Sequence, residues 1–105
     1  MTIPDLSKIK GFQWDKGNID KSYEKHGVTP KETEESFLDT GLQVERDIKH
    51  NEEEKRYIAI GATFKQKLLF IVFTIRRKRI RIISARSANK KEKDKYEKAQ
   101  KNSKI

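Results

Sequence analysis

The 105-residue chain contains no cysteine, only two prolines and one tryptophan, and only two histidines. Without cysteine, disulfides and thiolate metal sites are excluded, and two histidines with 23 residues between them disfavour a dedicated zinc site. The longest apolar stretch, residues 68–75, is far too short to span a bilayer. The first ten residues also lack the apolar segment of a secretory signal. These absences indicate a protein that is not exported, and we expect it in the cytoplasm.

Positive charge is concentrated in the last thirty residues. Residues 1–75 hold 12 lysines and arginines against 13 aspartates and glutamates, whereas residues 76–105 hold 13 against three. Such a basic block is typical of a surface for nucleic acid or another anionic partner, because it can displace counterions from a phosphate chain. The alternative is a solubilising tail. The length predicts one domain, residues 1–105, with a loose lead-in at 1–11 and a frayed basic tail at 100–105.

The first half of the chain predicts a short edge strand followed by two helices. The stretch "GFQWD" indicates the strand, and Asp15 is the expected N-cap of a helix over residues 16–26 that ends before Gly27. Thr29, Pro30 and Glu32 have the pattern of a capping box that starts a second helix. We expect this second helix to continue to about residue 38.

The second half predicts strands and one more helix. Apolar or alternating segments indicate strands within residues 42–48, 56–64, 67–75 and 79–85, and residues 68–73 predict a central strand buried on both faces. The connection "RRK" makes the last two strands a hairpin, and Asn89 with Glu92 predicts the start of a basic helix. The predicted fold class is therefore α+β, with two N-terminal helices, an antiparallel sheet of three to four strands and a C-terminal basic helix.

The inventory of reactive side chains is limited to arginines, two histidines and a few glutamates around the sheet. No glycine-rich phosphate loop, His-Glu-x-x-His motif or nucleophile elbow is present. This inventory suits cleavage of RNA by its own 2′-hydroxyl, because the substrate supplies the nucleophile. The protein then needs only to orient the chain, neutralise developing charge, and accept and donate protons. We predict that no cofactor and no metal is required.

Several motifs occur in a specific order: "FQWD", "KHGV", "SFLD", the pattern H-x-x-x-E-x-R-Y-I-A-I-G from His50 to Gly61, "F-T-x-R" and "IRIISAR". Between Phe12 and about Tyr96 the chain thereby resembles the BrnT family of ribonuclease toxins. The resemblance implies a RelE-like fold and metal-independent endoribonuclease activity that halts translation. It also implies a tightly bound BrnA-like antitoxin with a ribbon-helix-helix part, through which the toxin–antitoxin complex binds operator DNA. Asn18 and Ser22 stand where many family members have lysine and asparagine.

The resemblance and the charge map together select the candidate site residues. For His50, near-neutral titration suits proton transfer, and Arg56 suits bidentate phosphate binding; the alternative is a solvated loop with an ordinary ion pair. Arg76 follows the apolar strand and can reach the sheet rim. The predicted catalytic residues are His50, Glu54, Arg56, Arg76 and Arg86, and the predicted RNA-binding residues are Lys25, His26, Arg81, Lys90 and Lys91.

If the stretch "RIRIISARSA" forms a regular strand, its arginines lie on two different faces of the sheet. Arg79 and Arg81 then point to one face, and Arg86 points to the other with the isoleucines. Arg86 precedes a helix N-terminus and is the preferred phosphate ligand, whereas Arg79 and Arg81 solvate the opposite face or meet the antitoxin. A second hypothesis from another class is a non-catalytic module that binds RNA or an antitoxin. A third is a structural, ribosome-associated basic protein.

Overall fold

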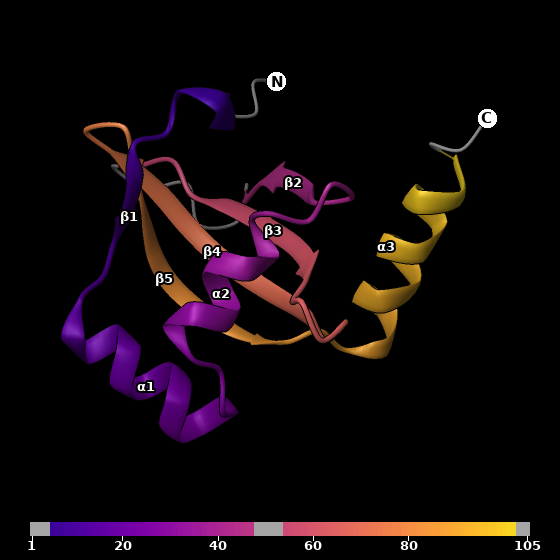
Figure 1. Ribbon diagram of the computed structural model, residues 1–105, viewed down its shortest axis with the longest axis horizontal. Helices are drawn as coiled ribbons and strands as arrows, with labels where there is room; N and C mark the ends of the chain where they lie inside the picture. The colour runs from indigo at the N-terminus through magenta and orange to yellow at the C-terminus, as the bar shows by residue number, and fades with distance from the viewer. Residues whose placement is uncertain (1–4, 48–53, 103–105) are drawn as a thin grey trace.

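The structure, a computed structural model, describes residues 5–47 and 54–102. A five-stranded sheet with the order β1-β5-β4-β3-β2 is flanked by three α-helices (Figure 1). In chain order the elements are the 3-10 helix η1 (Leu6–Lys8), β1 (Gly11–Gln13), α1 (Lys16–His26), α2 (Pro30–Ser36), β2 (Gln43–Arg46), β3 (Tyr57–Ala62), β4 (Leu68–Arg76), β5 (Arg79–Ser87) and α3 (Lys90–Asn102).

The sheet is mixed, which corrects the prediction of an antiparallel sheet with three to four strands. Strands β2 to β5 pair in antiparallel fashion, but β1 adds a fifth strand that runs parallel to β5, with Phe12 opposite Ile80. A strand of three residues has too little periodicity to indicate its partner. Its place beside β5 depends on tertiary packing, because Phe12 packs against the core while its neighbour Gln13 is exposed.

The two N-terminal helices begin where the capping signals predict. The Asp15 carboxylate accepts a hydrogen bond from the Gly17 amide at 2.8 Å, and α1 ends before Gly27, whose φ of 65° is favoured only by glycine. Thr29 and Glu32 form the reciprocal capping box of α2. Helix α2 ends at residue 36, two residues earlier than predicted, because the next amides, of Phe37 and Leu38, donate to carbonyls three residues back rather than four.

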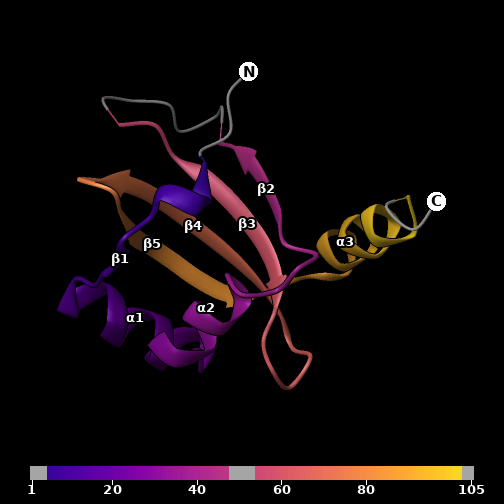
Figure 2. The same ribbon diagram turned by 45° about the horizontal axis from the view of Figure 1, so that its top comes forward.

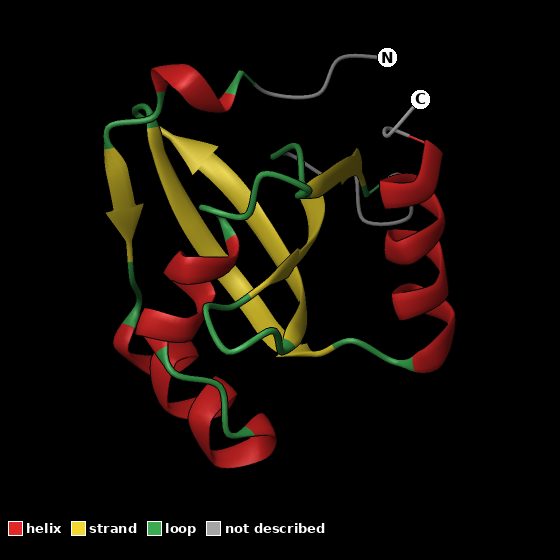
Figure 3. Ribbon diagram, turned by 45° about the vertical axis from the view of Figure 1, so that its right-hand side comes forward, coloured by secondary structure: helices red, strands yellow, loops and turns green. Residues whose placement is uncertain are grey.

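Helices α1 and α2 cover one face of the sheet, and the core lies between them and the strands (Figures 1 and 3). On this face Phe37 packs edge-on against Phe73 with ring centroids 5.2 Å apart. Strand β4 is central, as predicted, but it is not buried on both faces: Phe70 and Val72 on the other face are only half-buried. The fully buried apolar residues of the three long strands are Ala59, Leu69, Ile71, Phe73, Ile82 and Ala85.

Helix α3 lies at the β2 side of the sheet (Figure 2). Tyr96 donates its hydroxyl hydrogen to Asp39, and the Gln100 amide donates to the Gly41 carbonyl at 2.7 Å. The helix continues to residue 102, so the predicted frayed tail is helical at its start. Among residues 5–47 and 54–102, no helix has the length and apolar character needed to cross a membrane.

The lead-in is also more ordered than predicted. Residues 6–8 form η1, which is capped by Asp5, and both Leu6 and Ile9 pack against the core. The amide of Lys10 then donates to the carbonyl of Lys78 at 2.7 Å. This hydrogen bond fastens the lead-in to the turn between β4 and β5.

A β-bulge interrupts the pairing of β4 with β5. Val72 lies opposite Ser84, but the next residue, Phe73, lies opposite Ile82. Ile83 is therefore an extra residue in β5, and it shifts the alternation of side chains that follows it. The regular strand assumed for the stretch "RIRIISARSA" is wrong.

Candidate active site

An ion pair joins the start of β3 to the end of β4. Glu54 precedes β3 by three residues and Arg76 is the last residue of β4, so the antiparallel pairing of these strands brings the two side chains together. The Nε atom of Arg76 donates to Oε2 of Glu54 at 2.6 Å, and its Nη2 atom donates to Oε1. The pair is thus bidentate, the geometry in which arginine also binds phosphate.

Two further arginines act on the same carboxylate. The hydrogen bond from Arg76 is the main cause that holds the pKa of Glu54 below its ordinary value, and the charges of Arg81 and Arg56 add to it. Glu54 is therefore ionised at neutral pH and can accept a proton but not donate one. We call Glu54, Arg56, Arg76 and Arg81 the Glu54 cluster; it carries three positive charges and one negative charge.

Arg81 reaches this cluster from β5, because it lies opposite Thr74 on the face away from α1 and α2. Its Nη2 atom lies 3.5 Å from Oδ2 of Asp15, at the start of α1. The sequence interpretation missed Asp15 as a partner and considered it only as a helix cap. No local signal could have revealed the contact, since the two residues lie far apart in the chain and meet only through the pairing of β1 with β5.

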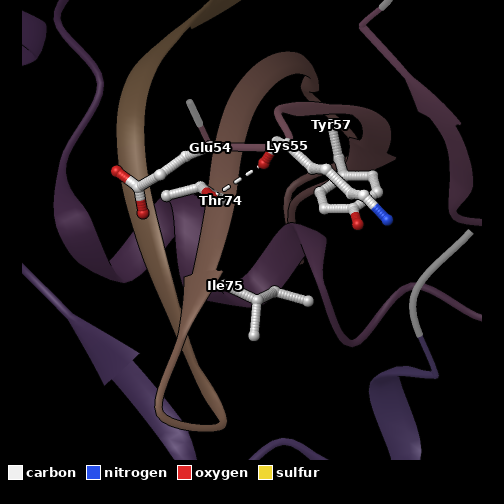
Figure 4. Close-up of a pocket in the computed structure, with 5 residues that line it drawn as sticks. All are labelled: Glu54, Lys55, Tyr57, Thr74 and Ile75. Carbon is white, nitrogen blue, oxygen red and sulfur yellow. Dashed lines mark hydrogen bonds between the residues drawn. The ribbon is translucent and has the colours of Figure 1, made fainter. Parts of the chain in front are cut away.

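A pocket of about 250 Å³ adjoins the cluster and is lined by Glu54, Lys55, Tyr57, Thr74 and Ile75 (Figure 4). The Thr74 hydroxyl donates to the Lys55 carbonyl at 2.8 Å, and the side chains of Glu54 and Lys55 extend to opposite sides. Pockets for drug-sized ligands measure about 300–1,000 Å³, so this pocket suits a small group of a longer substrate. In the described part of the chain, no three His, Asp or Glu side chains gather closely enough to hold a metal ion.

Arg86 does not join the Glu54 cluster. Arg81 lies opposite Thr74 and Arg86 lies opposite Phe70, four residues apart on β4, which is about 13 Å at 3.3 Å per residue. Its Nη1 and Nη2 atoms donate to the two carboxylate oxygens of Glu92, both at 2.8 Å, and its guanidinium lies 4.1 Å from the ring centroid of Phe70. Glu92 also accepts a hydrogen bond from the Asn89 amide as part of the capping box of α3. Arg86 therefore fastens α3 to the sheet.

The bulge also changes which arginines share a face. Ile82 and Ala85 are both buried toward the helices, so the residues between and after them turn outward. Arg79, Arg81 and Arg86 all lie on the opposite face, and the predicted separation of Arg86 from the other two by face is wrong. What separates them is distance along β5.

The remaining predicted residues lie apart from the cluster or outside the described residues. Lys25 and His26 are exposed in the last turn of α1, about 15 Å along the helix from its start near Asp15. Lys90 and Lys91 are exposed in the first turn of α3. His50 lies outside the described residues. The structure thus brings together Glu54, Arg56, Arg76 and Arg81 from the predicted set.

A family model described as "Ribonuclease toxin, BrnT, of type II toxin-antitoxin system" matches residues 14–92. The chain belongs to the BrnT family. The match includes the Glu54 cluster and ends at Glu92, within the first turn of α3. Membership makes the chain a ribonuclease toxin of a type II toxin–antitoxin system, with an antitoxin as partner.

A solved structure resembles this BrnT-family fold. The crystal structure of the Brucella abortus ribonuclease toxin BrnT, at 1.1 Å resolution, aligns with a TM-score of 0.61 and 23% sequence identity. The alignment covers 76% of this chain and 97% of the Brucella chain. At this identity the likeness shows the fold. The comparison with curated proteins finds no match.

Proposed function

We propose that this BrnT-family toxin is a metal-independent endoribonuclease that cleaves RNA through the substrate's 2′-hydroxyl and thereby arrests translation. The observation that carries the proposal is the gathering of Arg56, Arg76 and Arg81 around the ionised Glu54. Cationic side chains held in place before the reaction stabilise the negative charge that develops on the phosphate. A carboxylate beside them is available to accept a proton.

The Glu54–Arg76 pair sets how the substrate enters. A scissile phosphate offers two oxygen acceptors to the Nε and Nη2 donors of Arg76, which the Glu54 carboxylate occupies without substrate. The phosphate replaces the Glu54 carboxylate on the Nε and Nη2 edge of the Arg76 guanidinium. The freed carboxylate then lies next to the reacting 2′-hydroxyl. Because the pKa of Glu54 is lowered, we assign it the role of proton acceptor and assign proton donation to His50.

The proposed substrate path extends beyond the cluster. Lys25 and His26 at the end of α1, and Lys90 and Lys91 at the start of α3, are exposed and are proposed to contact RNA at a distance from the cut. For Arg86 we propose no direct contact with the scissile phosphate, because it lies opposite Phe70, four residues along β4 from Thr74, the partner of Arg81 in the Glu54 cluster.

The proposed partner is a BrnA-like antitoxin with a ribbon-helix-helix part. Family membership supports an antitoxin in general, and we extend it to this type. The toxin reaches operator DNA only through that partner. We propose that the two proteins form a hetero-oligomer in the cytoplasm.

The test is incubation of the purified, folded toxin with single-stranded RNA in EDTA. We expect fragments with 2′,3′-cyclic phosphate ends, since the 2′-hydroxyl is the nucleophile. RNA that stays intact at a high excess of folded protein would refute the proposal.

A second candidate function is RNA or antitoxin binding without cleavage. The observation that favours it is the closed Glu54–Arg76 pair, in which each group already satisfies the other. The variant His50→Ala separates the two: the enzyme loses cleavage and retains RNA affinity, whereas a pure binding module shows no cleavage before or after the change.

A further inference from the structure

The turn between β4 and β5 has a backbone that its residues disfavour. It consists of Arg77 and Lys78, whose φ angles are 51° and 64°. A two-residue hairpin turn with both φ angles positive is the usual place for Asn-Gly, because glycine has no Cβ atom and asparagine tolerates the left-handed region better than other side chains. The sequence places two long cations at these positions instead.

The charges at this turn also oppose one another. Arg76 and Arg79 lie directly opposite each other on the paired strands, with Cα atoms about 5 Å apart. This arrangement is unfavourable for two side chains of like charge. Glu54 compensates Arg76. Among residues 5–47 and 54–102, no carboxylate forms an ion pair with Arg77, Lys78 or Arg79, and all three are exposed. Residues 76–79 thus combine backbone strain at the two turn residues with charge repulsion between the two residues that flank them. Neither feature stabilises the fold.

The turn is nevertheless held in place beside the Glu54 cluster. The Lys78 carbonyl accepts the hydrogen bond from the Lys10 amide, and Arg79 lies on the same face as Arg81. Figures 1 and 2 show this turn and α3 at opposite ends of the molecule. The cations of the turn therefore extend the cluster away from α3.

We propose that Arg77, Lys78 and Arg79 bind the phosphates of the RNA strand next to the phosphate that occupies the Glu54 cluster. This inference rests on the proposed function. It adds that the bound RNA strand extends from the Glu54 cluster toward the turn between β4 and β5. RNA fits better than an acidic protein, because residues 76–79 are all cationic with no apolar side chain among them. Protein interfaces are built around apolar and aromatic side chains and are depleted in lysine.

The test uses the double variant Arg77→Asn with Lys78→Gly, which supplies the residues that the turn prefers. We expect it to melt no lower than the wild type, so that a loss of binding does not reflect unfolding. Binding is measured by fluorescence anisotropy with a labelled single-stranded 2′-O-methyl RNA, which cannot be cleaved. Loss of two phosphate contacts makes the log–log salt slope shallower by about 1.4. The ratio of the RNA affinity of the wild type to that of the double variant therefore falls about sevenfold between 50 and 200 mM salt.

The matched control is Lys31→Gln with Lys65→Gln, which removes the same charge at two exposed positions away from the turn. This control should keep the wild-type salt slope. An unchanged slope for the turn variant would overturn the proposal. So would a variant that keeps RNA affinity but loses affinity for poly-glutamate, because the turn would then serve an acidic protein.

The outcome is independent of the cleavage test. If the wild type cleaves RNA and the turn variant keeps its slope, only the inference about the turn fails. If the wild type leaves RNA intact but the variant has a shallower slope, the proposed reaction fails and the phosphate-binding turn stands.

Discussion

Removing the ion pair between Arg86 and Glu92 should loosen α3 without altering the Glu54 cluster. The two side chains are 35% and 16% exposed and share two hydrogen bonds of 2.8 Å. Charge-assisted hydrogen bonds contribute about 1.5–3 kcal/mol and exposed ion pairs about 0.2–1 kcal/mol, so this half-buried pair should contribute about 1.5 kcal/mol. With an unfolding entropy of about 2.1 cal/mol/K per residue over 105 residues, that loss lowers the melting temperature by about 7 °C.

The assay is a double-mutant cycle of Arg86→Met, Glu92→Gln and both together, followed by urea denaturation. Methionine keeps an aliphatic stem over Phe70, and glutamine still serves the capping box, so the cycle isolates the ion pair. The control Lys95→Gln removes a more exposed pair with Glu45 and should cost less than about 0.5 kcal/mol. A coupling energy near zero would refute the assignment of Arg86 as the anchor of α3.

Two further predictions concern the packing of α3 and α2. Burial and the hydrogen bond to Asp39 raise the pKa of Tyr96 to about 12 from an ordinary 10.0, so this group stabilises the fold below pH 10 and ceases to do so as the pH rises through about 12. The stability difference between the wild type and Tyr96→Phe should vanish over that range; a difference that persists contradicts the assignment. In Gly61→Ala the new Cβ would lie 2.6 Å from the Ser36 carbonyl oxygen and 2.7 Å from Cδ1 of Leu42. Urea denaturation should show a loss of about 1–3 kcal/mol, and an unchanged midpoint would contradict this packing.

Local signals in the sequence predicted the starts of the helices well. Thr29, Pro30 and Glu32 act through hydrogen bonds within one turn, so the capping box of α2 could be identified without knowledge of its surroundings. The end of α2 could not be placed to the residue, because the chain continues there as a turn with hydrogen bonds from the Phe37 and Leu38 amides to carbonyls three residues back. The strand β4 was predicted as central from its composition alone.

Features that depend on strand pairing were not predictable. The bulge at Ile83 leaves no signal in the sequence "RIRIISARSA", yet it decides which face Arg86 occupies. The partners of the arginines also depend on strand pairing, because Arg76 lies 22 positions after Glu54 in the chain. For the turn of Arg77 and Lys78 a signal was present in the sequence, because the short connection "RRK" lacks the glycine and asparagine that hairpin turns prefer.

Single-turnover cleavage of RNA by Arg76→Gln and Arg86→Met, in EDTA, tests the proposed function most directly. Arg76 belongs to the Glu54 cluster, and loss of one group that stabilises developing charge lowers a rate by about 100- to 1,000-fold. Arg86 lies outside the Glu54 cluster, so its folded variant should cleave at close to the wild-type rate. Wild-type cleavage by Arg76→Gln, or loss of cleavage by Arg86→Met alone, would contradict the proposed site.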